Sequence, residues 1–259
     1  MGTDEPSDDG ARKRRRGIYL LPNLLTTGCL FFGFLSIVSA VGGDYRWAAL
    51  AVYVAMVFDG LDGRVARMTG TQSDFGVQFD SLADLVSFGV APATVVYLWA
   101  LGETGAGTPW DNLGWMVAFL FLAAGALRLA RFNTQVGVAD KRYFQGLPSP
   151  AAAGAVVAVV WFGEHVGLTS MSAAVFAGAM SLMAAVLMVS NVRYLSFKEF
   201  DFRYKVRFVV IVALVAGVAL VAIHPPTAFL LLFGGYLLSG PVLTVVRLRH
   251  RRQARRHAE

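Results

Sequence analysis

The sequence is poor in charged residues and contains a single cysteine. Asp, Glu, Lys and Arg make up 15% of the 259 residues, whereas an ordinary soluble domain contains about 25%, so the chain cannot cover a water-exposed surface in the usual way. Because Cys29 is alone, neither a disulfide nor a cysteine-based metal site can form within one chain. These shortages, with 56% hydrophobic residues, argue against a disordered chain, a secreted disulfide scaffold and a soluble DNA-binding domain.

Long apolar runs, in contrast, are abundant. A transmembrane helix needs about 20 apolar residues, and solid apolar runs of this kind indicate helices, since barrel strands show only a weak alternation. We therefore expect an all-α polytopic membrane protein with about eight transmembrane helices: a disordered basic tail at 1–17, a membrane domain at 18–246 and a second basic tail at 247–259. The expected spans are 20–42, 46–66, 82–101, 114–130, 150–167, 171–190, 207–223 and 228–246.

The basic residues predict the orientation of these spans. Every Lys and Arg except Arg46 lies in a tail or beside every second loop, and the alternate loops at 102–113, 163–170 and 224–227 contain none. By the positive-inside rule, both termini and all basic loops are cytoplasmic, which predicts a location in the cytoplasmic (inner) membrane. The net charge of +6 is then explained by topology and by contacts with anionic membrane lipids, and no nucleic-acid partner is expected.

Four aspartates stand near the cytoplasmic ends of the second and third expected spans. Asp59 and Asp62 are three residues apart, and Asp80 and Asp84 are four apart. Residues at these spacings share one face of a helix. The segment 68–75 between the two pairs is rich in Thr, Gly and Ser and predicts a turn. The two helices are therefore expected to be antiparallel neighbours whose carboxylates converge.

A single aspartate near a helix end is commonly a cap, but four on converging faces favour a divalent-metal site. An ionised Asp costs about 2.5–3.5 kcal/mol in the middle of a bilayer, and repulsion between the carboxylates adds to this cost. Only Arg64 and Arg67 are near in sequence to compensate, whereas Mg²⁺ or Mn²⁺ would suit carboxylate oxygens. Gly63 and Ala66 leave the backbone bare, and Arg67 can bind phosphate oxygens, so the pattern indicates a site for a phosphate ester.

The pattern Asp59-x-x-Asp62-Gly63-x-x-Ala66-Arg67, followed after eight residues by Gly76-x-x-x-Asp80-x-x-x-Asp84, resembles the complete signature of the CDP-alcohol phosphotransferases. The resemblance implies a membrane enzyme that moves a phosphatidyl-type group from a CDP-lipid to an alcohol and releases CMP. It implies one divalent cation held by Asp59, Asp62 and Asp80. A second cation would be bridged by Asp59 and Asp80 and completed by Asp84, which would also be the catalytic base. The implied contacts of the CDP moiety are Gly63, Ala66, Arg67 and Ser73.

Other segments indicate the acceptor alcohol. Arg128 and Arg131 lie at the cytoplasmic end of the fourth span, where they are either topology anchors or a cationic pocket for an acidic acceptor, such as the carboxylate of an amino acid. The segments 19–27, 128–133, 145–150 and 192–198 together resemble the type II branch of the phosphatidylserine synthases. This resemblance implies CDP-diacylglycerol as the donor and L-serine as the acceptor. The candidate serine contacts are Arg128, Arg131, Asn133 and Gln145.

Other functions stay open at this point. The same chemistry could serve glycerol 3-phosphate or an inositol phosphate, or the aspartates could bind the transported ion of a cation transporter. A purely structural protein would leave four clustered aspartates unexplained. A homodimer is expected, and pairs such as Ala174 and Gly178 fit close helix packing either in a dimer or within one chain.

Two helix starts are predicted from capping signals. Thr71, with Asp74 three residues later, fits a capping box before the third span. Ser149 followed by Pro150 fits an N-cap and a first helical residue at the start of the fifth span.

Overall fold

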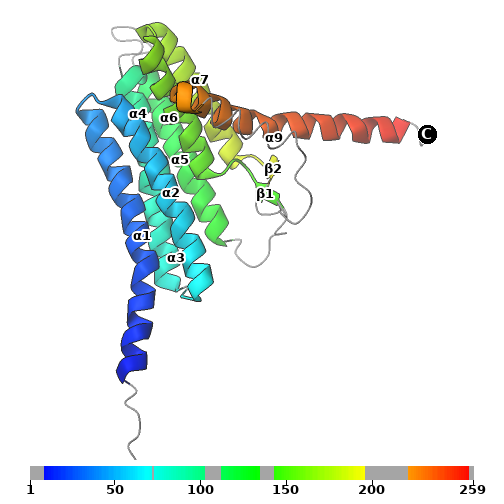
Figure 1. The fold of residues 1–259 in the computed structure, drawn as a ribbon. Helices are drawn as coiled ribbons and strands as arrows, with labels where there is room; N and C mark the ends of the chain where they lie inside the picture. Colours follow the sequence, from blue (N-terminus) through cyan, green and yellow to red (C-terminus); the bar gives the residue numbers. More distant parts are fainter. Residues whose placement is uncertain (1–8, 72, 103–111, 135–142, 196–220, 257–259) are drawn as a thin grey trace, which may run out of the picture.

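The computed structural model describes residues 9–71, 73–102, 112–134, 143–195 and 221–256, and these form a bundle of helices with one two-stranded ribbon (Figure 1). The all-α fold class is thereby confirmed. Helix α1 begins at Asp9, inside the segment 1–17 assigned above to a tail, so the domain division stays a prediction. The elements are α1 (Asp9–Val41), α2 (Tyr45–Thr69), α3 (Asp74–Asp84), η1 (Leu85–Val90), α4 (Ala91–Val96), η2 (Tyr97–Leu101), α5 (Leu113–Thr134), β1 (Tyr143–Gln145), α6 (Ser149–Val166), α7 (Ser170–Val189), β2 (Arg193–Leu195) and α9 (Pro225–Arg256).

Six helical segments of the described chain are long and apolar enough to cross a membrane, which supports a polytopic membrane protein. Of the two further spans expected, 46–66 lies within α2, and 207–223 lies mostly outside the described residues. The number eight and the cytoplasmic position of both termini therefore stay predictions. The six segments are Leu20–Val41, Asp74–Leu101, Leu113–Thr134, Ser149–Val166, Ser170–Val189 and Pro225–Thr244.

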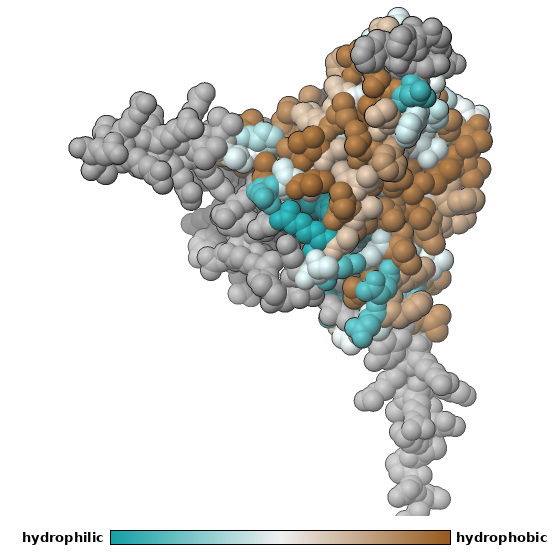
Figure 2. Space-filling view, turned by 180° about the vertical axis from the view of Figure 1, so that it is seen from behind, coloured by the Kyte–Doolittle hydropathy of each residue, from teal (hydrophilic) through white to brown (hydrophobic). Residues whose placement is uncertain are grey.

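The outer surface of the bundle has the character of a lipid-facing surface. Figure 2 shows one face that is covered mainly by hydrophobic side chains. Large apolar side chains on several helices are more than half exposed, which would be costly in water but not against lipid chains. Examples are Phe31, Phe34, Phe119, Val175 and Phe176.

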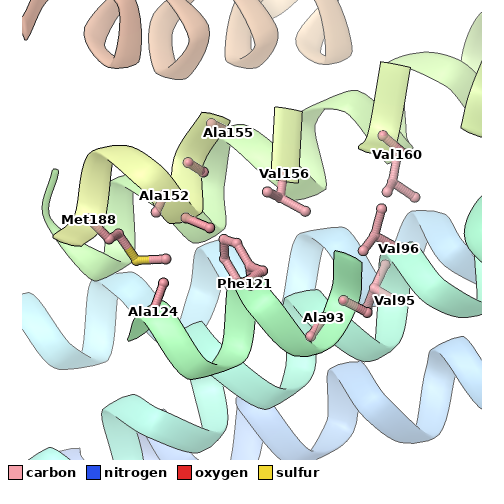
Figure 3. Close-up of a cluster of buried hydrophobic side chains, with 14 of the residues drawn as sticks. Ala93, Val95, Val96, Phe121, Ala124, Ala152, Ala155, Val156, Val160 and Met188 are labelled. Atoms are coloured by element: carbon pink, nitrogen blue, oxygen red, sulfur yellow. The ribbon is translucent and has the colours of Figure 1, made fainter. Parts of the chain in front are cut away.

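Helix α6 forms the centre of the hydrophobic core. It is apolar on all sides, as expected for a helix surrounded by others, and it packs against α2, α7 and α9. Figure 3 shows Phe121 of α5 pointing toward Ala152 and Val156 of α6, with Val96 of α4 nearby, and all four side chains are fully buried. The small side chain of Ala152 leaves room for the ring, so the alanines of α6 permit close helix packing.

Aromatic side chains anchor α2 and α9 to this central helix. The hydroxyl of Tyr53 in α2 donates a hydrogen bond to the carbonyl oxygen of Gly154 in α6 at 3.0 Å, and its ring stacks on Phe233 of α9 with the centroids 5.4 Å apart. A Cβ atom at Gly154 would lie 2.5 Å from the ring of Phe233. The helix that carries Asp59 and Asp62 is therefore fixed to the core by its own middle turns.

The third expected span begins earlier than predicted, because helical conformation is continuous from α3 to η2. Both η1 and η2 are π-helical turns, which insert an extra residue and are often found near functional sites. Segment η1 starts directly after Asp84. Within it, Ser87 donates a hydrogen bond to the carbonyl oxygen of Cys29 in α1 at 3.0 Å. Gly33 permits this contact, because a Cβ atom there would overlap Ser87.

The ribbon joins two loops whose pairing the sequence did not indicate. Strands β1 and β2 pair in antiparallel fashion, and the N–H of Gly146 extends the pairing by donating to the carbonyl oxygen of Val192 at 2.8 Å. The buried side chain of Tyr194 donates from its hydroxyl to the carbonyl oxygen of Leu237 in α9 at 3.0 Å. A Cβ atom at Gly240 would overlap the Tyr194 ring, so the ribbon packs against α9 through this ring at Gly240.

The predicted start of α6 is wrong by one residue. Ser149 is the first helical residue rather than the cap, and Pro148 occupies the N-cap position with a ψ of 137°. Ser149 Oγ is buried and, among the described residues, has no hydrogen-bond partner. Since Pro148 already has an extended backbone, the chain enters the helix at Ser149 and Pro150 becomes the second helical residue.

Candidate functional site

The four aspartates lie on a helical hairpin formed by α2 and α3. Helix α2 ends at Thr69 and is capped by Gly70, whose left-handed conformation (φ +63°) is typical of a C-cap. With a rise of about 1.5 Å per residue, Asp62 and Asp80 lie about 10 Å from the turn, and Asp59 and Asp84 lie about 15 Å from it. The antiparallel helices therefore bring a shallow pair and a deep pair of aspartates to matching heights.

These residues form an acidic cluster, here called the Asp cluster (Asp59, Asp62, Asp80 and Asp84). One carboxylate oxygen from each of Asp59, Asp62 and Asp80 lies within 4.8 Å of the other two. Asp62 is 4% exposed, and the other two are half-buried. Asp84 interacts electrostatically with all three, and its buried Oδ1 has no hydrogen-bond partner among the described residues. Carboxylate oxygens at this spacing fit a divalent cation of the Mg²⁺ or Mn²⁺ type.

Gly63, Ala66 and Arg67 form a strip that follows Asp62 along α2. A Cβ atom at Gly63 would lie 3.3 Å from Arg67 Nη1, so the missing side chain leaves room for the guanidinium group above the backbone. Arg67 is exposed, and Gly63 and Ala66 are partly exposed. These three predicted CDP contacts are therefore accessible to a ligand beside the Asp cluster.

Ser73, the fourth predicted CDP contact, is the N-cap of α3. Its Oγ accepts a hydrogen bond from the N–H of Gly76 at 3.1 Å. The predicted capping box at Thr71 is wrong, because α3 starts at Asp74 and the Thr71 hydroxyl is instead 2.7 Å from Thr69 Oγ1. A Cβ atom at Gly76 would lie 3.2 Å from Ser73 Oγ, so glycine suits the capped turn.

Helix α1 contributes side chains that sequence reasoning did not single out. Thr26 Oγ1 donates a hydrogen bond to Asp62 Oδ2 at 2.7 Å, and both side chains are buried. Asn23 lies beside the start of α3, because a Cβ atom at Gly76 would be 3.5 Å from Asn23 Oδ1. The sequence signal for these residues was the resemblance of the segment 19–27, which gave no role to either side chain.

Asn133, a candidate acceptor contact at the end of α5, is hydrogen-bonded to the hairpin. Its Nδ2 donates a hydrogen bond to Ser81 Oγ at 3.0 Å, and Ser81 follows Asp80 directly. Gln145 lies in β1, and its side chain is outside the described part of the structure. The structure thus brings Asn133 to the edge of the Asp cluster.

Arg128 and Arg131 lie in the last turns of α5, and their side chains contact the end of α7 and the residue that follows its cap. Arg131 Nη2 donates to Asn191 Oδ1 at 2.8 Å, and Arg128 Nη1 is 3.5 Å from the carbonyl oxygen of Met188. Gly146 has a positive φ of +78°, and a Cβ atom there would lie 2.9 Å from Arg128 Nη1. The same Cβ atom would lie 2.5 Å from the carbonyl oxygen of Met188, so both this backbone contact and the positive φ favour glycine at this position.

On the face shown in Figure 2, most hydrophilic side chains lie from the middle of the bundle toward the end from which α1 extends, and a smaller hydrophilic patch lies near the opposite end. The turn between α2 and α3 lies at the end from which α1 extends (Figure 1). A polar end on a mainly apolar surface is suited to the membrane interface, where a lipid headgroup and a water-soluble molecule can meet.

Comparison with known proteins gives consistent matches. Residues 19–238 match the family model described as CDP-alcohol phosphatidyltransferase. The CDP-diacylglycerol–serine O-phosphatidyltransferase of Helicobacter pylori strain J99 is 40% identical over 224 residues, which cover 86% of this chain and 90% of that protein. The archaetidylserine synthase of Methanothermobacter thermautotrophicus is 34% identical over 184 residues, covering 70% and 72%. A CDP-diacylglycerol–serine O-phosphatidyltransferase of Methanocaldococcus jannaschii is 37% identical over 153 residues, covering 59% and 66%.

Proposed function

This chain belongs to the CDP-alcohol phosphatidyltransferase family, and we propose that it transfers the phosphatidyl group of CDP-diacylglycerol to L-serine, forming phosphatidylserine and CMP. The observation that carries the reaction type is the convergence of Asp59, Asp62 and Asp80 on one helical hairpin. Serine as the acceptor is supported by the names of the relatives, which share serine although they differ in the lipid.

The Asp cluster would hold two divalent cations, Mg²⁺ or Mn²⁺. Asp59, Asp62 and Asp80 would bind the first, and Asp59 and Asp80 would bridge to a second that Asp84 completes. When bound, such cations neutralise phosphate charge and stabilise the attacking and leaving oxygens of a displacement. Oδ1 of Asp84 supports this assignment, because it is buried without a hydrogen-bond partner in the described part of the chain, and such a carboxylate oxygen is costly.

Asp84 would act as the general base of the transfer. It takes the proton of the serine hydroxyl as that oxygen bonds to the lipid-side phosphorus, and the bond between this phosphorus and the oxygen of CMP breaks. The strip of Gly63, Ala66 and Arg67 would hold the diphosphate and the nucleotide, with Ser73 contacting the nucleotide from the turn. Because the side chain of Arg67 is exposed in the structure, it can move onto the phosphate oxygens when the lipid binds.

The serine would lie between the hairpin and the end of α5. Asn133 is bonded to Ser81 at the edge of the Asp cluster, so it is suited to orient the acceptor near the reacting hydroxyl. Arg128 and Arg131 supply positive charge for the serine carboxylate, and Gln145 completes the set. We place this site on the cytoplasmic side of the inner membrane, in a homodimer surrounded by anionic lipids.

The proposal is tested by CMP release from the purified, detergent-solubilised protein given CDP-diacylglycerol and Mn²⁺ or Mg²⁺. Release that requires both metal and L-serine, with formation of a lipid that carries a serine headgroup, is the expected result. Release that depends instead on glycerol 3-phosphate or an inositol phosphate would overturn serine and keep the reaction type. No release with any acceptor, from folded and metal-loaded protein, would overturn the enzyme assignment.

A further inference from the structure

Thr26 is a buried hydroxyl on α1 that lies against the Asp cluster, although it is 36 residues from the aspartate that it contacts. Its side chain is 4% exposed, as is that of Asp62. Oγ1 of Thr26 is 2.7 Å from Asp62 Oδ2 and 3.1 Å from the carbonyl oxygen of Pro22. Thr26 is the only described residue outside the hairpin for which a hydrogen bond to the cluster is seen.

The two acceptors of this hydroxyl are not equivalent. A threonine hydroxyl has one proton, and the carbonyl oxygen of Pro22 is four residues earlier in the same helix, where the backbone N–H of Thr26 is its normal donor. A carboxylate is the stronger acceptor, and a distance near 2.7 Å is typical of an O–H···O⁻ hydrogen bond. The proton of Thr26 is therefore directed to Asp62.

Helix α1 is fitted closely to its neighbours in the turns that follow this contact. A Cβ atom at Gly28 would lie 2.6 Å from the ring of Phe58, the residue before Asp59. Further along, Gly33 packs against Ser87, which donates to the carbonyl oxygen of Cys29. Because α1 is fitted to α2 and to η1 at these glycines, the hydroxyl of Thr26 is held in a fixed place relative to Asp62.

We propose that Thr26 is a positioning residue of the metal site: its hydroxyl fixes the carboxylate of Asp62 in the orientation that binds the first divalent cation. The inference rests on the proposed metal site. Groups that hydrogen-bond to metal ligands orient them, and their loss typically weakens metal binding by about 10–100-fold. Thr26 would not touch the substrate, so its effect is on cation affinity.

The test is Mn²⁺ binding to the full-length protein in detergent without substrates, measured by electron paramagnetic resonance of free Mn²⁺ and by calorimetry. Thr26→Val keeps the shape of the side chain and removes the hydroxyl, and it should weaken the Asp62-dependent site by about 10–100-fold. Thr26→Ser keeps the hydroxyl and should restore binding close to that of the wild type. Thr27→Val is the matched control, because the Thr27 hydroxyl is exposed and, among the described residues, bonds only to the carbonyl oxygen of Asn23 in its own helix.

Thr26→Val with wild-type Mn²⁺ affinity would overturn the inference and leave the proposed function intact. If the wild type itself shows no site that Asp62→Asn abolishes, the proposed metal site fails and the inference with it. Should Thr26→Val not yield monodisperse protein, the comparison is made between Thr26→Ser and Thr26→Ala. Equal Mn²⁺ affinity of these two variants would then overturn the inference, and weaker binding by the alanine variant alone would support it.

Discussion

Removing one charge from the Asp cluster should make the protein more stable than the wild type when metal is absent. When metal is added, the same variant should be less stable than the wild type. The variant is Asp80→Asn, which keeps the size of the side chain. In the wild type, the oxygens of Asp59, Asp62 and Asp80 lie within 4.8 Å of one another. Two unit charges at that distance repel each other by about 3.5 kcal/mol at an effective dielectric constant of about 20.

Asp80 has two such neighbours, but it is half-exposed, so solvent screens part of the repulsion. A gain of about 1–3 kcal/mol is therefore expected for the metal-free variant, which corresponds to several degrees in the unfolding temperature. Bound metal reverses the order. A cation present at about 1,000 times its Kd stabilises the protein that binds it by about 4.1 kcal/mol, which exceeds this gain, and the variant lacks one ligand for that cation.

The assay is thermal loss of monodisperse protein in detergent, at mildly alkaline pH so that the carboxylates are ionised, after chelation and again with Mn²⁺. The matched control is Asp44→Asn, which removes a charge from the opposite end of α2, where Asp44 caps the N–H of Trp47 at 3.1 Å and asparagine caps equally well. It should show the wild-type response to Mn²⁺. A metal-free Asp80→Asn protein that is less stable than the wild type, or an equal Mn²⁺ response in both, would refute the reasoning.

Three further substitutions test the base, the nucleotide strip and the ribbon. Asp84→Asn should lower turnover by about 10²–10⁴-fold in the CMP-release assay, and full activity would show that Asp84 is not the base. Gly63→Val places a side chain where Arg67 Nη1 lies and should raise KM for CDP-diacylglycerol more than KM for serine; equal changes would contradict the strip. Tyr194→Phe should cost about 1 kcal/mol in thermal unfolding, the value of one hydrogen bond, and a larger loss than in Gly240→Ala would contradict the overlap argument.

The hairpin with its aspartates was predictable because it is local. Spacings of three and four residues fix which side chains share a helix face, and a short turn forces two helices to be neighbours. The residues Asp59, Asp62, Asp80 and Asp84 therefore follow from about 26 residues of sequence. The helical character of the chain followed from the apolar runs in the same way.

The contacts that the sequence did not indicate are those between distant segments. The hydrogen bond from Thr26 to Asp62 depends on how α1 packs against α2. The ribbon depends on two loops that pair with each other beside α9. The cap positions predicted at Thr71 and Ser149 were wrong by one or two residues, because several adjacent residues can cap a helix and packing decides between them. Local patterns carry no information about either choice.

The distance of the Asp cluster from the turn of its hairpin gives the two substrates different routes to the site. A diacyl lipid cannot move far along the membrane normal, because its chains hold the diphosphate at the edge of the hydrocarbon layer. The hairpin places the aspartates about 10–15 Å from its own turn, so only a donor whose diphosphate lies at that level can reach them. In the proposed orientation, with the turn on the cytoplasmic side, serine has no chains that fix its level and would reach the same height from the water. One substrate is thus selected by where it lies in the membrane, and the other by how it enters.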